Sequence, residues 1–419
     1  MKGISTKQHI YTKKELSEAP LYVAVDIFTF TEIISNSSAF VGLTGSEAHI
    51  YVLFKLFRYS AYLLCVLCMV LKGRYSVKGI LGFGIASSAV LLATIYSKDN
   101  ALILYMLFLG AAAGTDGRKL IKVFFRAQSI GLISIILTVL FGFVDNYVRF
   151  TGGRDRHFLG FSWATTAPIL FLFIVMQYIY LKKGIVSIAE YIILLLLGVW
   201  FYIQTRTRMA FIVTAGTLSF FLLCGRYLKD KSEKGNRIGI IYKIIPASPW
   251  ICATASFWAV YLYGQGGKWM IKMNDLLAGR LKWSLEGLKD YGVSLWGQPI
   301  VWIGNNINET LRGAYNYVDC SYIQIFLKCG IIYFLIVLIA YTMILRKAVQ
   351  DREYYLCWII VFVLGFSMTE PRLVNLMYNP FILLCVTTGN ACRMYRSNKG
   401  ELDEKRGFHS YAKTEIIDG

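Results

Sequence analysis

Long apolar segments alternate with short polar ones along most of the chain. Twelve segments are mainly apolar, and most approach the roughly 20 residues that a helix needs to cross a bilayer. The first contains Asp26 and Glu32, and the fourth is short. We expect transmembrane helices at residues 21–43, 51–71, 79–97, 100–114, 125–144, 163–181, 186–204, 209–224, 244–263, 319–345, 354–369 and 373–392.

One long polar interval, residues 264–318, interrupts this alternation. Within it, residues 274–288 predict an amphipathic helix, because leucines recur on one side of a helix of this register. Asn274 or Asp275 would cap its N-terminus. We expect the helix to lie in the membrane interface with these leucines in the acyl boundary, which puts Arg280 at headgroup depth. The leucines are Leu277, Leu281, Leu285 and Leu288.

The composition agrees with a membrane protein. Of the 419 residues, 56% are apolar and 16% are charged, whereas about a quarter of the residues in a soluble domain are charged. Helices are the expected spanning element, because barrel strands would be about ten residues long with alternating polarity. The first twenty residues lack the apolar core of a signal peptide. The sequence therefore predicts an all-α polytopic membrane protein, with an N-terminal segment 1–20, nine spans in 21–263, the loop 264–318, three spans in 319–392 and a tail 393–419.

Basic residues give the chain a net charge of +19, but they lie mainly between the spans. When both termini are placed in the cytoplasm, every cytoplasmic segment is basic, as the positive-inside rule requires. We therefore interpret the charge as a consequence of membrane topology, and we expect no nucleic-acid partner. The same topology places residues 264–318 outside, together with 145–162, 204–208 and 370–372.

Arginines on the outer face run against that rule and are candidate phosphate ligands. A guanidinium presents a planar fork of donors that matches phosphate oxygens. Arg206 and Arg208 lie together between two predicted spans, and we favour Arg208. The first outer loop adds Arg154, Arg156 and His157, of which His157 is the candidate for proton transfer. The alternatives are an arginine that only anchors a span end at the interface and an ordinary loop histidine.

Two carboxylates at the outer boundary, Asp319 and Glu370, are candidates for a general base. Carboxylates are costly to desolvate at this depth, and they tend to mark sites or paired charges. Either could deprotonate a sugar hydroxyl, and either could instead be the structural partner of an arginine. The chain has no nucleotide-phosphate loop, and its nine cysteines follow no metal-binding spacing. We therefore expect no metal and no cofactor.

Four segments of the chain share a pattern with a known family. They are TRTRMAF at 205–211, NDLLAGRLKWSLEGLKDYGVSLWG at 274–297, VDCSYIQIFLKCGIIYF at 318–334 and MTEPRLVNLMYNPFILL at 368–384. In this order, and with the long loop, they resemble the Wzy-type polysaccharide polymerases of the O-antigen ligase and polymerase superfamily. The chain departs from the family after its first outer loop, where Gly160-Phe161-Ser162-Trp163-Ala164-Thr165 stands in place of Gly-Phe-x-His-Pro-Asn.

The resemblance implies a GT-C-like fold with one large extracytoplasmic loop, in a bacterial cytoplasmic membrane. It implies inverting, metal-independent glycosyl transfer at the outer face between undecaprenyl-diphosphate-linked oligosaccharide repeat units. The implied partners are these glycans, the lipid bilayer, a chain-length regulator and a flippase. Arg208 and Arg280 would contact the diphosphate, and Asp319 or Glu370 would be the base. The substrate-binding residues would be Arg154, Arg156, His157, Arg206, Tyr322 and Arg372.

Two other functions stay open at this point. An O-antigen ligase would differ in its acceptor, but that branch has a histidine in its large loop, and residues 264–318 contain none. A lipid-linked oligosaccharide flippase would be expected to show pseudo-repeats and charged residues deep in its central spans. Here the charged residues gather at one outer face instead, which favours the polymerase.

Overall fold

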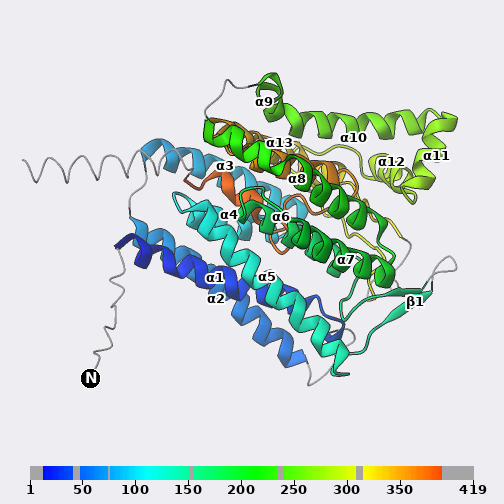
Figure 1. The fold of residues 1–419 in the computed structure, drawn as a ribbon, viewed down its shortest axis with the longest axis horizontal. Coiled ribbons are helices and arrows are strands. Elements are labelled where there is room, and N and C mark those ends of the chain that lie inside the picture. The colour runs from blue at the N-terminus through cyan, green and yellow to red at the C-terminus, as the bar shows by residue number, and fades with distance from the viewer. Residues whose placement is uncertain are drawn as a thin grey trace, which may run out of the picture.

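The structure of the chain is a computed structural model that describes residues 13–40, 48–73, 76–150, 155–234, 239–307 and 315–388. It is a bundle of α-helices with one small β-hairpin (Figure 1). The longer helices are α1 (Lys13–Ser35), α2 (Ala48–Lys72), α3 (Val77–Ser97), α5 (Gly117–Leu140), α7 (Ile188–Thr205), α8 (Arg208–Lys234), α10 (Ser248–Gly264) and α13 (Ser321–Gln350). The shorter elements are η1 (Ser38–Phe40), α4 (Ala101–Ala112), β1 (Val148–Phe150), β2 (Asp155–His157), α6 (Thr166–Leu181), α9 (Ile240–Ile244), η3 (Ile245–Ala247), α11 (Lys268–Leu276), α12 (Arg280–Tyr291), α14 (Tyr354–Phe366) and η4 (Pro380–Cys385).

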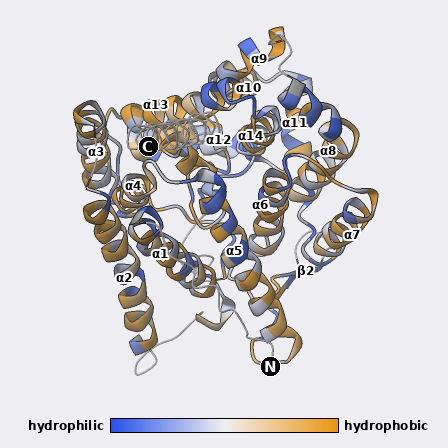
Figure 2. Ribbon diagram, turned by 60° about the vertical axis from the view of Figure 1, so that its left-hand side comes forward, coloured by the Kyte–Doolittle hydropathy of each residue, from blue (hydrophilic) through white to orange (hydrophobic). Residues whose placement is uncertain are grey.

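Seven helical stretches among the described residues are long and apolar enough to cross a membrane. They lie in α2, α3, α5, α7, α8, the α9–α10 segment and α13, and α4, α6 and α14 are shorter apolar helices. Hydrophobic residues cover much of α2, α3 and α7 (Figure 2), as lipid-facing helices require. The predicted all-α membrane protein is therefore confirmed at this level, whereas the predicted twelve spans are not confirmed, because seven of the described stretches meet this length and composition.

Helix α6 is short and lies inside the bundle. Nearly all of its residues are buried, and it packs against α5, α7, α8 and α14. A helix that is apolar on all sides is expected to be enclosed by other helices. The predicted span at residues 163–181 is thus an interior helix of the described fold.

The last predicted span, residues 373–392, is not a long helix over its described part. After α14 the chain continues as irregular structure and the short 3₁₀ helix η4. The backbone N–H of Leu373 donates to Ser321 Oγ at the start of α13, and Lys347 near the end of α13 donates to the carbonyl of Thr387. The segment therefore runs along α13 from one end of the bundle toward the other, but without forming the predicted α-helix.

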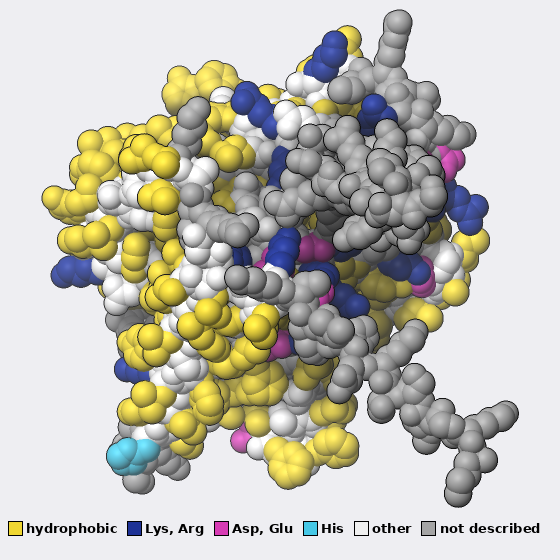
Figure 3. All heavy atoms as spheres, turned by 90° about the vertical axis from the view of Figure 1, so that its left-hand side faces the viewer, with side chains coloured by type: hydrophobic (Ala, Val, Ile, Leu, Met, Phe, Trp, Pro, Cys, Tyr) yellow, Lys and Arg dark blue, Asp and Glu magenta, His cyan; other side chains and the backbone are white. Residues whose placement is uncertain are grey.

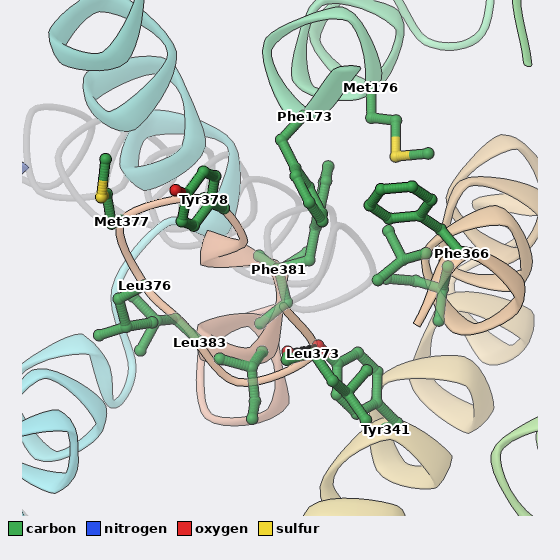
Figure 4. Close-up of a cluster of buried hydrophobic side chains, with 14 of the residues drawn as sticks. Phe173, Met176, Tyr341, Phe366, Leu373, Leu376, Met377, Tyr378, Phe381 and Leu383 are labelled. Carbon is green, nitrogen blue, oxygen red and sulfur yellow. Dashed lines mark hydrogen bonds between the residues drawn. The ribbon is translucent and has the colours of Figure 1, made fainter. Parts of the chain in front are cut away.

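Buried side chains donate to backbone carbonyls of this irregular segment, and apolar side chains pack around it (Figure 4). The carbonyl of Leu373 accepts hydrogen bonds from Tyr341 Oη (2.7 Å) and from Asn379 Nδ2 (2.8 Å). Gln128 Nε2 donates to the carbonyl of Met377 (2.9 Å). Irregular backbone at membrane depth is tolerated only where protein encloses it and satisfies its polar groups. The enclosing apolar side chains include Phe173, Phe366 and Phe381.

The predicted interfacial helix at residues 274–288 is two helices, α11 and α12. The chain turns between them at Ala278 and Gly279, which have left-handed φ angles of 55° and 84°. Asn274, one of the two predicted N-caps, accepts a hydrogen bond from the backbone N–H of Lys282 (3.0 Å). It thus caps α12, although it belongs to α11.

The leucine side of α12 faces the protein and not the lipid. Leu281 is buried, and Leu285 and Leu288 pack against the apolar core. Helix α12 contacts α10 and α13, which cover this side. The expectation that these leucines lie in the acyl boundary is therefore wrong, and their packing turns Arg280 toward the interior of the molecule.

Candidate functional site

Arg280 lies at the start of α12 between two carboxylates. Its Nη2 donates to Oε1 of Glu370 at 2.5 Å, and its Nε lies 3.4 Å from Oδ2 of Asp319. The side chains are largely enclosed, with exposed fractions of 16% for Arg280 and 4% for Glu370. We call Arg280, Asp319 and Glu370 the Arg280 cluster. It contains three of the four residues that the sequence predicted as catalytic.

Ser321 holds the two carboxylates side by side. Its Oγ donates to the carbonyl of Glu370 (2.6 Å), and its backbone N–H donates to the carbonyl of Ser367 (2.9 Å). Asp319 lies just before α13, and Glu370 lies just after α14. The hydrogen bonds of Ser321 therefore join the two segments that carry the carboxylates. The backbone geometry thereby presents both acids to the one guanidinium of Arg280.

Burial controls the electrostatics of the cluster. Burial raises the pKa of Asp319 to about 6, with a further rise from Glu370 and an opposing effect from Arg280. For Arg280, burial lowers the pKa, but Glu370 and Asp319 more than offset it, so the guanidinium stays charged. Asp319 is therefore mostly ionised at neutral pH and basic enough to accept a proton.

A cavity of about 500 Å³ lies close to the cluster, although none of the three cluster residues lines it. Tyr317 and Arg372 form part of its wall, and each is two residues from a carboxylate of the cluster. Its other polar or aromatic lining residues are Glu32, Asn36, Ser97, Lys98, Trp163, Trp302, Lys328, Asn375 and Tyr378. A concave site with aromatic walls and a few polar groups is the usual form of a small-molecule site.

Arg372 is the cavity arginine whose donors are not occupied. Its side chain makes no hydrogen bond or ion pair with the described residues, and its Nε is buried without a partner. Its guanidinium stacks on Tyr378 with 4.7 Å to the ring centroid. By contrast, Glu32 is paired with Arg58 (2.8 Å), and Lys328 is paired with an aspartate (Asp99, 2.7 Å). Lys98 also lines the cavity, is exposed and has no ion pair with the described residues, so an anion in this cavity would meet two unpaired cations, Arg372 and Lys98.

Three aromatic rings form a continuous wall of the cavity. The centroid of Tyr317 lies 5.2 Å from that of Trp163 and 6.3 Å from that of Trp302. Such rings combine a flat apolar face with a polar edge. They suit a sugar ring, whose C–H faces are apolar and whose hydroxyls lie at its rim.

The β-hairpin connects this site with the turn between α7 and α8. Nε of Arg156 donates to the carbonyl of Thr205 (3.1 Å). Burial lowers the pKa of Arg156, while the nearby charge of Glu370 opposes this change, so Arg156 also lies within electrostatic reach of the cluster. Arg206 and Arg208 are exposed in this turn, and no contact among the described residues joins either side chain to the Arg280 cluster.

His157 and Tyr322 make their hydrogen bonds with residues outside the cluster. Nδ1 of His157 accepts a hydrogen bond from Asn146 Nδ2 (2.9 Å). Tyr322 is fully buried, and its hydroxyl donates to the carbonyl of Leu364 (3.0 Å), which joins α13 to α14. Arg154 lies outside the described residues.

The sequence analysis missed the aromatic wall of the cavity. One signal was present, because Trp163 stands where the resembled family often has histidine. The contact of Trp163 with Tyr317 joins segments far apart in the chain, so spacing alone could not predict it. Among the described residues, no group of histidine, cysteine or acidic side chains is arranged to hold a metal ion.

Comparisons with protein-family models, with curated proteins and with solved structures found no match to the chain.

Proposed function

We propose that the chain is a polysaccharide polymerase that joins undecaprenyl-diphosphate-linked oligosaccharide repeat units at the outer face of a bacterial cytoplasmic membrane. The observation that carries this proposal is the contact of Arg280 with Asp319 and Glu370, next to an aromatic cavity that contains Arg372. These residues come from three of the four segments that resemble the polymerases. Their convergence supports reading the segments as parts of one site.

In the proposed reaction, a hydroxyl oxygen of the acceptor glycan attacks the anomeric carbon of the donor glycan. The bond between that carbon and the diphosphate oxygen breaks, and undecaprenyl diphosphate leaves with the electron pair. The hydroxyl proton passes to the carboxylate of Asp319. Attack from the face opposite the leaving group inverts the anomeric configuration.

Asp319 suits the role of base better than Glu370. Its contact with Arg280 is the longer one, at 3.4 Å against 2.5 Å, so its carboxylate is less committed to the ion pair. Burial raises its pKa to about 6, which brings it near the range of a useful base at neutral pH. Glu370 is more deeply enclosed, and we assign it the structural role of holding Arg280.

Arg372 suits the diphosphate. Negative charge grows on the leaving group during the reaction, so a fixed guanidinium stabilises the transition state more than the ground state. Arg372 faces the cavity with donors that no described residue occupies, whereas those of Arg280 contact two carboxylates. In this proposal Arg280 positions the base. Direct contacts of Arg208 and Arg280 with the diphosphate stay predictions of the resemblance.

The cellular experiment is a gel of surface polysaccharide from a strain that lacks the protein. The proposal predicts that the ladder collapses to a single repeat unit, and that Asp319→Asn fails to restore it although the variant inserts in the membrane. Asp290→Asn is the matched control, because Asp290 is exposed on α12 and has no partner among the described residues. We expect this control to restore the ladder.

The outcomes separate the alternatives. If the protein were a ligase, the strain that lacks it would keep long polymer on its lipid carrier, unattached to its final acceptor. If it were a flippase, that strain would keep single units on the cytoplasmic side of the membrane. Either result would contradict the proposed polymerase.

A further inference from the structure

A second groove lies at the opposite end of the bundle from the Arg280 cluster. Its volume is about 510 Å³, and it opens between η3, the start of α10 and the last turns of α13. Helix α13 begins two residues after Asp319, is kinked at Gly330 and ends at Gln350, which lines the groove. The groove is therefore separate from the proposed glycosyl-transfer site by the whole length of a spanning helix.

The charged residues among the described lining of this groove are both basic. They are Lys243 and Arg346, both are exposed, and neither has an acidic partner among the described residues. Two cations without a counterion at one concave site attract a phosphate or another anion.

Aromatic residues give the groove a fixed shape. The indole N–H of Trp250 donates to Thr342 Oγ1 (3.0 Å), which holds this partly exposed ring at the rim. The ring of Tyr242 lies 4.2 Å from that of Tyr354, centroid to centroid. The ammonium of Lys231 lies 4.6 Å from the centroid of Tyr242. A stack of this kind keeps the groove floor in place.

The surroundings of the groove are those of a membrane interface. Helix α9 exposes Ile240 (76%) and Ile244 (57%) on either side of Lys243 in sequence. Trp250 and its neighbour Ile251 are exposed at the start of α10, a candidate span. Exposed isoleucines, a rim tryptophan and basic residues together are typical of a segment that lies at the lipid–water boundary.

We propose that this groove binds the phosphate headgroup of an anionic phospholipid. Lys243 and Arg346 would contact the phosphate, and the acyl chains would lie against the exposed isoleucines of α9. Lysine and arginine side chains recur over this end of the molecule (Figure 3), and they would draw anionic lipid toward it. The inference does not depend on the proposed function, because it concerns a different site.

The apolar surroundings decide between a lipid and a free anion. Inorganic phosphate could use the two cations, but it would gain nothing from Trp250 and the exposed isoleucines. A phospholipid would use both. The test must therefore compare an anionic phospholipid with inorganic phosphate, which has the charge without the acyl chains, and with a phospholipid that has the same chains but no net charge.

The experiment is a titration of the purified full-length protein in detergent, with the thermal midpoint as the readout. We expect phosphatidylglycerol to raise the midpoint saturably, whereas phosphatidylcholine with the same chains and inorganic phosphate do not. The double variant Lys243→Gln/Arg346→Gln should need roughly thirtyfold more phosphatidylglycerol for the same shift, because two surface charges are lost. In phosphatidylcholine its midpoint should equal that of the wild type, which shows that it folds.

The control is Lys122→Gln/Lys183→Gln, which removes the same charge from the same end of the bundle. Both lysines are exposed and lie outside the groove. Arg118 at the start of α5 donates to the carbonyl of Leu181 (3.5 Å), just before the turn that carries Lys183. It also pairs with Glu353, three residues after the end of α13 (3.5 Å). These contacts place both lysines at this end. The control should respond to phosphatidylglycerol like the wild type.

Three results would overturn the proposal. Equal stabilisation by the two phospholipids would show that the headgroup charge is not recognised. An equal loss in the groove variant and the control would show that only the general charge of this end matters. Saturable stabilisation by inorganic phosphate alone would make the groove a site for a free anion rather than for lipid.

Discussion

Replacing Arg280 with glutamine removes the cation that contacts two enclosed carboxylates. The exposed fractions of 16% for Arg280, 20% for Asp319 and 4% for Glu370 leave the acids little access to water. Loss of one partner of a buried ion pair costs about 3–5 kcal/mol. With an unfolding entropy of about 2.1 cal/mol/K per residue, a chain of 419 residues would lose about 4 °C in its melting temperature.

A double-mutant cycle makes this prediction specific. Adding Glu370→Gln to Arg280→Gln removes one of the stranded charges, so the double variant should melt at or above the temperature of Arg280→Gln alone. Lys289→Gln, on the exposed side of the same helix, should leave the melting temperature unchanged. The assay is thermal unfolding of the purified variants in one detergent.

The cycle also has a result that would refute the reasoning. If the losses from Arg280→Gln and Glu370→Gln add within about 0.5 kcal/mol, the two side chains are not coupled in the folded protein. The Arg280 cluster would then not be an interaction that stabilises the fold, and the assignment of Arg280 as the residue that positions Asp319 would have no basis.

Further predictions concern the base, the cavity and the irregular segment. The rate of glycan joining should rise with pH through about 6, because Asp319 accepts a proton only when it is ionised, and a flat profile between about pH 5 and pH 8 would contradict this role. Arg372→Gln should lower kcat about 10²-fold or more, and Arg372→Lys should restore only part of it because lysine lacks the planar fork. Trp163→Ala should raise KM for the acceptor with a smaller change in kcat, as loss of uniform binding does. Gln128→Leu should destabilise the protein by about 1–3 kcal/mol in thermal unfolding, because the buried carbonyl of Met377 loses a donor.

The apolar pattern could predict the long helices because each is apolar over most of its length. For α2, α3, α5 and α13, length and composition alone are sufficient. The same pattern misread residues 373–388, since an apolar segment inside the protein need not be helical. Its irregular backbone depends on hydrogen-bond donors from elsewhere in the chain, among them Tyr341 and Gln128. The sequence of the segment itself does not predict these donors.

The site could be predicted by residue but not by arrangement. Asp319 and Glu370 stand out as charged residues at the boundaries of apolar segments, and Arg280 stands out in the amphipathic stretch of the long polar interval. Their contacts join residues 39 and 90 positions apart, and sequence spacing does not specify such pairs. The inward orientation of Arg280 follows from the packing of the leucine side of α12 on α10 and α13. The free donors of Arg372 likewise become visible only when its neighbours are placed.

The most direct test of the proposed glycosyl transfer is to count undecaprenyl diphosphate released by the purified protein from lipid-linked repeat units. The account predicts one diphosphate released for each new glycosidic bond in the wild type, with inverted anomeric configuration, and neither product with Asp319→Asn. Intact lipid-linked single units after incubation with wild-type protein, with no diphosphate released and no bond formed, would contradict it.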